Sequence, residues 1–157
     1  MNNNVQPFFS LSQTEQREII LTSATQLSME PHVVEKDLWV CWVLNRLFAL
    51  PNHLPMAFKG GTSLSKAYHV IHRFSEDVDV TIDYTAFDNT LKDPFAGGVS
   101  KSAQKKLSDA LRTQLAHYVH DKVKPYFKNI AKREFDGKVD ISVDESGENL
   151  TSNILLS

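Results

Sequence analysis

Cysteine, long apolar runs and an excess of one charge are all scarce in this chain. It has 157 residues and one cysteine, Cys41, so no internal disulfide can form, which fits a reducing compartment. The most apolar stretch, Leu38–Leu50, contains Asn45 and Arg46 and is too short to cross a bilayer. The first residues lack the basic and apolar segments of a signal peptide. We therefore expect a cytoplasmic protein that has no membrane partner.

The composition is that of a globular domain. Hydrophobic residues make up 41% of the chain and charged residues 23%, which excludes intrinsic disorder, collagen-like repeats and a disulfide-stapled mini-protein. A chain of this length can bury enough surface for a core without a structural metal. The formal net charge of -2 gives no indication of a nucleic-acid coat protein.

The small net charge hides an uneven distribution. Residues 101–138 contain ten basic residues and only four acidic ones. One interpretation is an ordinary solvated helix face. The other is a surface for a polyanion, such as a nucleotide tail or an RNA backbone. The sequence leaves both interpretations open.

Local signals predict two helices at the start of the chain. Ser12 and Glu15 have the spacing of a capping box, which predicts a helix from about Gln13 to Leu27. Pro31 suits the first turn of a second helix that continues to about Leu50. The residues of this second helix with core-facing spacing are Val40, Val43, Leu44 and Leu47. We expect Cys41 and the two tryptophans to be packing residues.

Strands and helices are then expected to alternate. A short buried strand is predicted at Met56–Phe58, followed by a Gly-Gly turn and a third helix capped by Thr62 or Ser63. Residues Ser75–Asp83 alternate polar and apolar side chains, which is typical of a half-buried strand. The third helix should bury Leu64, Ala67, Tyr68 and Ile71 on one face.

The last part of the chain predicts a long helix and two strands. The helix runs from about Lys101 to Val123, where Pro125 interrupts it and starts one more short helix. The strands are Val139–Val143 and Asn153–Leu156. The expected buried face of the long helix is Leu107, Leu111, Leu115 and Tyr118. This order indicates an α+β (mixed α/β) domain over 1–157, with a helical lead-in (1–50) and a small mixed sheet flanked by helices (51–157).

Two aspartates in the alternating segment point to metal chemistry. In a strand, side chains two residues apart lie on one face, about 6.5–7 Å apart along the backbone. Asp77 and Asp79 therefore point together, while Val78 and Val80 point into the core. Two convergent carboxylates bind hard divalent cations such as Mg²⁺ or Mn²⁺. Asp83 continues this face but lies beyond the expected metal.

The residues before these aspartates suit a phosphate group. A turn at Gly60 and Gly61 lets the backbone approach a ligand closely, and the following helix offers free N–H groups. Thr62 and Ser63 add hydroxyl groups. Lys59, Lys66 and Arg73 add positive charge nearby. The order of residues differs from that of a Walker phosphate loop. A triphosphate held here, with a metal ion bridging it to Asp77 and Asp79, would form a phosphoryl-transfer site.

The segment FKGGTSLSKAYHVIHRFSEDVDVTID, residues 58–83, resembles the signature of the AbiEii/AbiGii toxin-type nucleotidyltransferases, within the DNA polymerase β-like superfamily. The segment Glu35–Val40 also resembles that family's lead-in helix. The resemblance implies that Asp77 and Asp79 are the catalytic, metal-binding acids. It also implies that the nucleotide-phosphate loop consists of Gly60, Gly61, Thr62 and Ser63. Three further residues match family positions near that site: Lys66, Arg73 and Ser75.

The same resemblance implies an activity and partners. The activity is transfer of a nucleoside monophosphate from an NTP to a hydroxyl acceptor, and some members use tRNA. The expected role is that of a toxin in a toxin–antitoxin or phage-defence system, with a cognate antitoxin as partner. The superfamily also uses a third carboxylate. Family members are longer than this chain, so we expect that carboxylate beyond Ser157, with Asp140 as the alternative. The chain would then be the N-terminal part of a longer enzyme.

Other functions remain as alternatives. A catalytically incomplete module that binds a nucleotide or a partner would lack the third acid. A metal-dependent nuclease would use the same aspartates without an NTP. Histidine pairs with helical spacing occur at His69/His72 and His117/His120, but two histidines without a third ligand are usually surface residues. No Gly-x-Ser-x-Gly sequence supports serine-nucleophile chemistry at Ser63 or Ser65.

Overall fold

The computed structural model describes residues 8–59, 78–87, 97–136, 138–143 and 150–154. Helices and strands are both present, which confirms the α+β class. The chain divides into two compact units, the first made of Met1–Ala49 with Phe58–Asp79 and the second of Leu50–Ala57 with Val80–Ser157. The elements in chain order are η1 (Phe8–Ser10), α1 (Gln13–Leu27), α2 (Pro31–Phe48), β1 (Met56–Lys59), β2 (Asp79–Ile82), η2 (Tyr84–Ala86), α4 (Lys101–Tyr118), η3 (Val119–Val123), α5 (Lys124–Phe135), β3 (Val139–Val143) and β4 (Leu150–Ile154).

Helix α1 begins with the predicted capping box. The backbone N–H of Ser12 donates to Glu15 Oε2 at 2.9 Å, and the N–H of Glu15 donates to Ser12 Oγ at 3.3 Å. The helix ends at Leu27, and the capping residue Ser28 donates its N–H to the carbonyl groups of Ala24 and Thr25. The left-handed backbone of Ser28 (φ 53°) then lets the N–H of Met29 donate to the carbonyl oxygen of Ala24 at 3.0 Å. Both bounds of this helix agree with the sequence prediction, because both depend on residues within one turn.

Helix α2 begins at Pro31, as predicted, and ends at Phe48, two residues before the predicted end. Its buried side chains are Val34, Val40 and Trp42. Aromatic rings add to this core. The centroid of the Trp39 ring is 4.9 Å from that of Phe9 and 6.0 Å from that of Trp42. The prediction that Cys41 is a packing residue is wrong, because its side chain is exposed. Successive helix residues are rotated by about 100°, which turns Cys41 away from the face that buries its neighbours.

Strands β1 and β2 pair with each other. The N–H of Asp83 donates to the carbonyl oxygen of Pro55 at 2.8 Å, so the end of β2 meets the start of β1 and the strands run antiparallel. Burial alternates along both strands. The predicted strand began at Ser75, but residues 75–77 lie outside the described residues, as does the predicted third helix.

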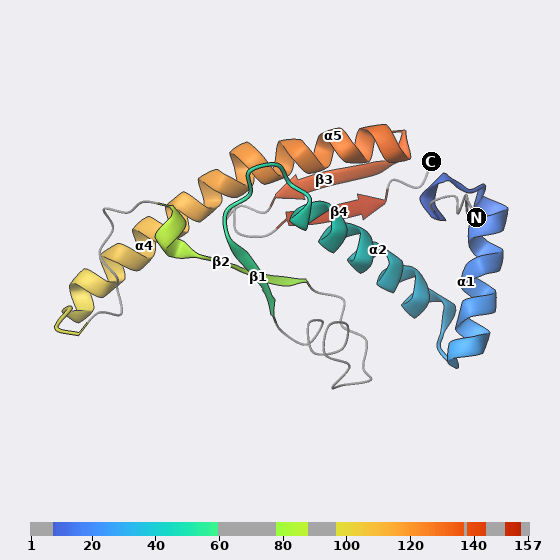
Figure 1. Ribbon diagram of the computed structural model, residues 1–157, viewed down its shortest axis with the longest axis horizontal. Coiled ribbons are helices and arrows are strands. Elements are labelled where there is room, and N and C mark those ends of the chain that lie inside the picture. The colour runs from blue at the N-terminus through green and yellow to red at the C-terminus, as the bar shows by residue number, and fades with distance from the viewer. Residues whose placement is uncertain (1–7, 60–77, 88–96, 137, 144–149, 155–157) are drawn as a thin grey trace, which may run out of the picture. The chain divides into compact units, whose positions relative to one another are not determined.

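Helices α4 and α5 follow each other through the π-helical turn η3 without a break, as Figure 1 shows. The predicted interruption at Pro125 is therefore wrong, although Pro125 does lie in the first turn of α5. Within η3 the N–H of Lys124 donates to the carbonyl oxygen of Val119, five residues earlier. This wider turn brings the chain to Pro125 at a position where a missing N–H costs little.

The core of the second unit lies between the end of this helical run and strand β3. Phe127 and Ile141 are its largest fully buried side chains, each about 1% exposed. Val119, Val123, Ile130, Ala131 and Val139 are also buried. The face of α4 predicted to be buried is only half-buried at Leu107, Leu111, Leu115 and Tyr118.

Strands β3 and β4 form an antiparallel pair, in which Ile141 lies opposite Ser152. The bounds of β3 agree with the prediction. Strand β4 begins three residues before the predicted Asn153 and ends before the predicted Leu156. In the described part of the chain, the four strands therefore form two separate two-stranded sheets.

Candidate functional site

Asp79 is the first residue of β2, and its side chain is exposed. The residues on either side, Val78 and Val80, are half-buried. This alternation agrees with the predicted orientation of the aspartate away from the apolar face. The Asp79 carboxylate makes no hydrogen bond or ion pair with any other described residue.

Lys59 and Asp79 lie at the same end of the β1–β2 hairpin, because the strands are antiparallel and these residues end β1 and begin β2. Both are exposed. The chain between them carries the rest of the predicted site. Those residues, Gly60, Gly61, Thr62, Ser63, Lys66, Arg73, Ser75 and Asp77, lie outside the described residues.

Asp83 has a structural role at the other end of β2. Its Oδ1 accepts hydrogen bonds from the Thr85 N–H at 3.0 Å and from the Thr85 hydroxyl at 2.7 Å. These bonds cap the 3-10 turn η2 and lower the pKa of the Asp83 carboxyl, the bond from the Thr85 side chain contributing most. The alternation of residues 75–83 predicted Asp83 on the polar face but gave no indication of this cap, although an Asp side chain that bonds the backbone two residues later is a known turn signal.

Asp140 is the alternative third acid, and it lies on β3 in the second unit. It is exposed between buried Val139 and Ile141. Its Oδ1 is 4.0 Å from the Lys128 Nζ, and both side chains are about half exposed (49% and 51%). At this distance and exposure the ion pair is weak. Asp140 therefore keeps about half of its side-chain surface in contact with solvent.

Histidine contacts are also found on the long helical run. His120 Nδ1 lies 2.8 Å from Asp121 Oδ1, and this bond is the main cause of a lowered pKa of the Asp121 carboxyl. His117 lowers that pKa further through its charge. Within the described ranges, no group of three or more His, Cys, Asp or Glu side chains comes together as a metal site. The pair His69/His72 lies outside the described residues.

Residues 42–156 match the family described as nucleotidyl transferase AbiEii toxin of type IV toxin–antitoxin systems. The chain belongs to this family. The match spans the β1–β2 hairpin, the chain between its strands, and β3 and β4, and it confirms the resemblance found in the sequence. Searches of curated proteins and of solved structures found no match.

Family membership places the chain among the nucleotidyltransferase toxins. An antitoxin and a nucleotide substrate are the partners associated with such a toxin–antitoxin system. None of the described helices has the length and apolar character required to cross a bilayer.

Proposed function

We propose that this chain carries the nucleotide-binding core of a metal-dependent nucleotidyltransferase. The enzyme transfers a nucleoside monophosphate from an NTP to a hydroxyl group, and RNA, including tRNA, is the acceptor. The observation that carries the proposal is Asp79, an exposed carboxylate at the start of β2 without a described partner, in a chain of the AbiEii family. The proposed role is that of a cytoplasmic toxin in a toxin–antitoxin or phage-defence system.

The proposed reaction forms one phosphorus–oxygen bond and breaks another. The acceptor hydroxyl oxygen attacks the α-phosphorus of the NTP and loses its proton. The bond between the α-phosphorus and the oxygen that bridges the α- and β-phosphates breaks, and pyrophosphate leaves. Asp77 and Asp79 would hold Mg²⁺ or Mn²⁺, which suits carboxylate oxygens as ligands. The ion would supply charge neutralisation on the phosphates and on the leaving pyrophosphate.

Other residues of the same segment would bind the triphosphate. Backbone N–H groups at Gly60 and Gly61 and the hydroxyl groups of Thr62 and Ser63 suit phosphate oxygens. Lys66 and Arg73 would add positive charge, and Ser75 one more hydroxyl group. The alternation observed at residues 79–82 supports the exposed position proposed for Asp79, because strand side chains repeat every two residues.

The test is transfer of an α-labelled NTP to RNA by the full-length protein. We expect Asp77→Asn and Asp79→Asn each to reduce transfer by a factor of about 100 or more, since each removes a metal ligand. Glu18→Gln is the matched control, because Glu18 is an exposed acid on α1 without a described partner. Unchanged transfer in the Asp77→Asn/Asp79→Asn double variant would refute the proposal.

Two outcomes would point to the alternative functions. Calorimetric binding of an NTP with Mg²⁺, without transfer to any RNA, would indicate a nucleotide-binding module. Cleavage of RNA in Mg²⁺ or Mn²⁺ without an NTP, lost in the double variant, would indicate a nuclease. Thermal unfolding of each variant shows whether a loss of activity reflects a loss of folding.

A further inference from the structure

The helical run from α4 to α5 presents a row of basic side chains to solvent. In α5, Lys124, Lys128 and Lys132 are four residues apart, so they share one face and are about 6 Å apart along the axis. The buried residues Phe127, Ile130 and Ala131 lie on the side of α5 that packs against β3. We use the name basic helix face for these three lysines, of which Lys124 is half-buried and the other two are exposed, together with the exposed cations of α4: Lys101, Lys105, Lys106 and Arg112.

Most of this charge has no neutralising partner among the described residues. Lys101, Lys105, Lys106, Lys124 and Lys132 make no hydrogen bond or ion pair with any other described residue. Two acids of the helical run have other contacts, since Asp121 bonds His120 and Glu134 lies 3.7 Å from Arg133. The ion pair of Lys128 with Asp140 is long, at 4.0 Å. A row of uncompensated cations attracts a polyanion and gains free energy when the polyanion releases its counterions.

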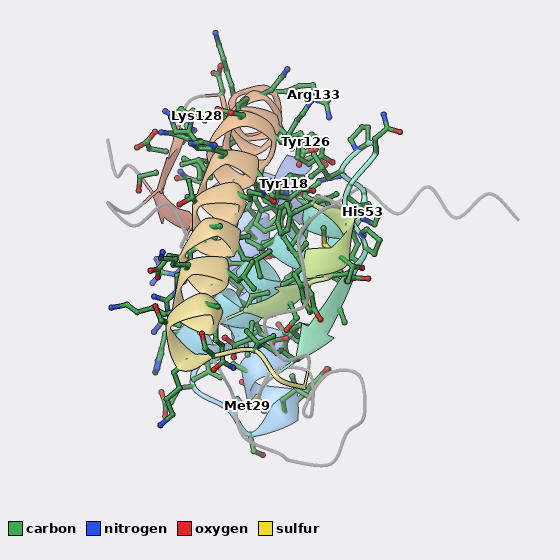
Figure 2. The ribbon with its side chains drawn as sticks, turned by 90° about the vertical axis from the view of Figure 1, so that its left-hand side faces the viewer. Met29, His53, Tyr118, Tyr126, Lys128 and Arg133 are labelled. Atoms are coloured by element: carbon green, nitrogen blue, oxygen red, sulfur yellow. The ribbon has the colours of Figure 1, made fainter. Side chains whose placement is uncertain are left out.

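The basic helix face lacks the groups that would suit other partners. Figure 2 shows Tyr118 and Tyr126 on the side of the helical run away from Lys128, so these rings are not placed to stack on bases. The exposed large hydrophobic residues of the described chain, Ile19, Leu21, Leu27, Met29 and Phe48, all lie outside α4, η3 and α5. A helix that binds a membrane surface inserts such residues between lipids. The surface therefore suits a hydrated phosphate backbone.

We propose that the basic helix face binds the phosphate backbone of the RNA acceptor, without recognition of its bases. The inference rests on the proposed function in one respect, namely that RNA is the acceptor. Cations about 6 Å apart along a rigid helix make several phosphate contacts with one strand. Contacts of this kind position a nucleic acid and carry no base specificity.

The experiment measures binding of a fluorescent single-stranded RNA to the full-length protein by anisotropy over a range of salt concentrations. Lys124→Gln/Lys132→Gln removes two charges from the basic helix face. We expect the Kd to rise about tenfold or more, and the slope of log Kd against log salt to fall by about 1 to 1.5. Equal affinity and slope for this variant and the wild type would leave the face as an ordinary solvated surface and overturn the proposal.

Lys122→Gln/Arg133→Gln is the matched control, because it removes the same charge from exposed residues of the same helical run. Figure 2 shows Arg133 and Lys128 on opposite sides of α5, and Lys122 is three helical turns before Arg133. We expect this control to change the Kd less than about threefold. An equal loss in both double variants would indicate only the effect of net charge and overturn the proposal. So would equally charge-dependent binding to phosphatidylserine vesicles, which would assign the face to a membrane.

Separate results would refute the RNA-binding role of the basic helix face and the proposed nucleotidyltransferase activity. Asp77→Asn/Asp79→Asn should abolish transfer and leave RNA affinity within about twofold of the wild type, because the basic helix face is intact. RNA binding that depends on Lys124 and Lys132, without transfer from any NTP, would refute the proposed function and support the surface. If Lys124→Gln/Lys132→Gln transfers nucleotides to RNA with an unchanged KM for RNA, the proposed function is supported. The same result would refute RNA binding by the basic helix face.

Discussion

The backbone N–H of Leu54 donates a hydrogen bond of 3.2 Å to the hydroxyl oxygen of Tyr118, which is 64 residues further along the chain. The ring of Tyr118 also meets the ring of Phe87 edge to face, with centroids 6.1 Å apart. Figure 2 shows Tyr118 on the side of α4 that faces His53, next to Leu54. One side chain of α4 thus holds both the segment before β1 and the turn after β2.

We predict that Tyr118→Phe lowers the free energy of unfolding by about 1 kcal/mol, because it leaves the half-buried N–H of Leu54 without an acceptor while keeping the ring contact. Urea denaturation of the chain measures this difference. Tyr126→Phe is the control, since the Tyr126 hydroxyl makes no hydrogen bond with any described residue and its ring is also half-buried. Equal stability of Tyr118→Phe and Tyr126→Phe would contradict the prediction.

The capping box of α1 gives a second prediction. Ser12→Ala removes the hydroxyl group that accepts from the Glu15 N–H, and we expect a loss of about 1 kcal/mol in the free energy of unfolding. Thr14→Ala is the control in the same turn, because Thr14 is exposed and has no described partner. Urea denaturation at neutral pH should separate the two variants, and a stability of Ser12→Ala equal to that of Thr14→Ala would refute the cap.

The same capping box also depends on pH. The hydrogen bonds from the Ser12 side chain and backbone lower the pKa of the Glu15 carboxyl from its ordinary value of 4.5. A carboxyl with a lowered folded pKa stabilises the fold at pH values above 4.5, and this contribution is lost as the pH falls through the folded pKa. The advantage of the wild type over Glu15→Gln should therefore fade as the pH is lowered below 4.5. A constant difference between the wild type and Glu15→Gln across this pH range would argue against the bond.

Asp140 gives a fourth prediction, one that bears on the site. The ion pair with Lys128 is long and half exposed, so Asp140→Asn should change the free energy of unfolding by less than about 1 kcal/mol. We also expect Asp140→Asn to keep transfer activity within about threefold of the wild type, measured in the assay used for Asp79→Asn. A loss as large as that of Asp79→Asn, in a variant that folds normally, would instead identify Asp140 as the third acid.

The sequence predicted elements best where their signals are local. The capping box of Ser12 and Glu15 and the proline at the start of α2 each involve residues within a few positions, and the helix starts that they predict are confirmed. The predicted bounds of β3 are also confirmed. Strand β4 was displaced in the prediction, because its position depends on pairing with β3 rather than on its own composition. Pro125 was expected to break a helix, which the π-helical turn η3 prevents.

The candidate site shows the same difference between what nearby residues predict and what the structure must show. The family was recognised from residues 58–83, and the match over residues 42–156 confirms it. The exposed position of Asp79 followed from alternation and is confirmed in β2. The roles of Asp77 and of the Gly-Gly segment stay predictions, because those residues lie outside the described chain.

Residues close together in the chain were therefore enough to indicate the family, the caps of α1 and the exposed face of β2, since a cap or an alternating strand depends on a few neighbouring dihedral angles. The contact of Tyr118 with Leu54, the register of β3 with β4 and the exposed cysteine in α2 required the folded chain. So did the exposure of most lysines of α4 and α5. These features depend on which surfaces of distant segments pack together, and packing is a property of the whole fold rather than of any one segment.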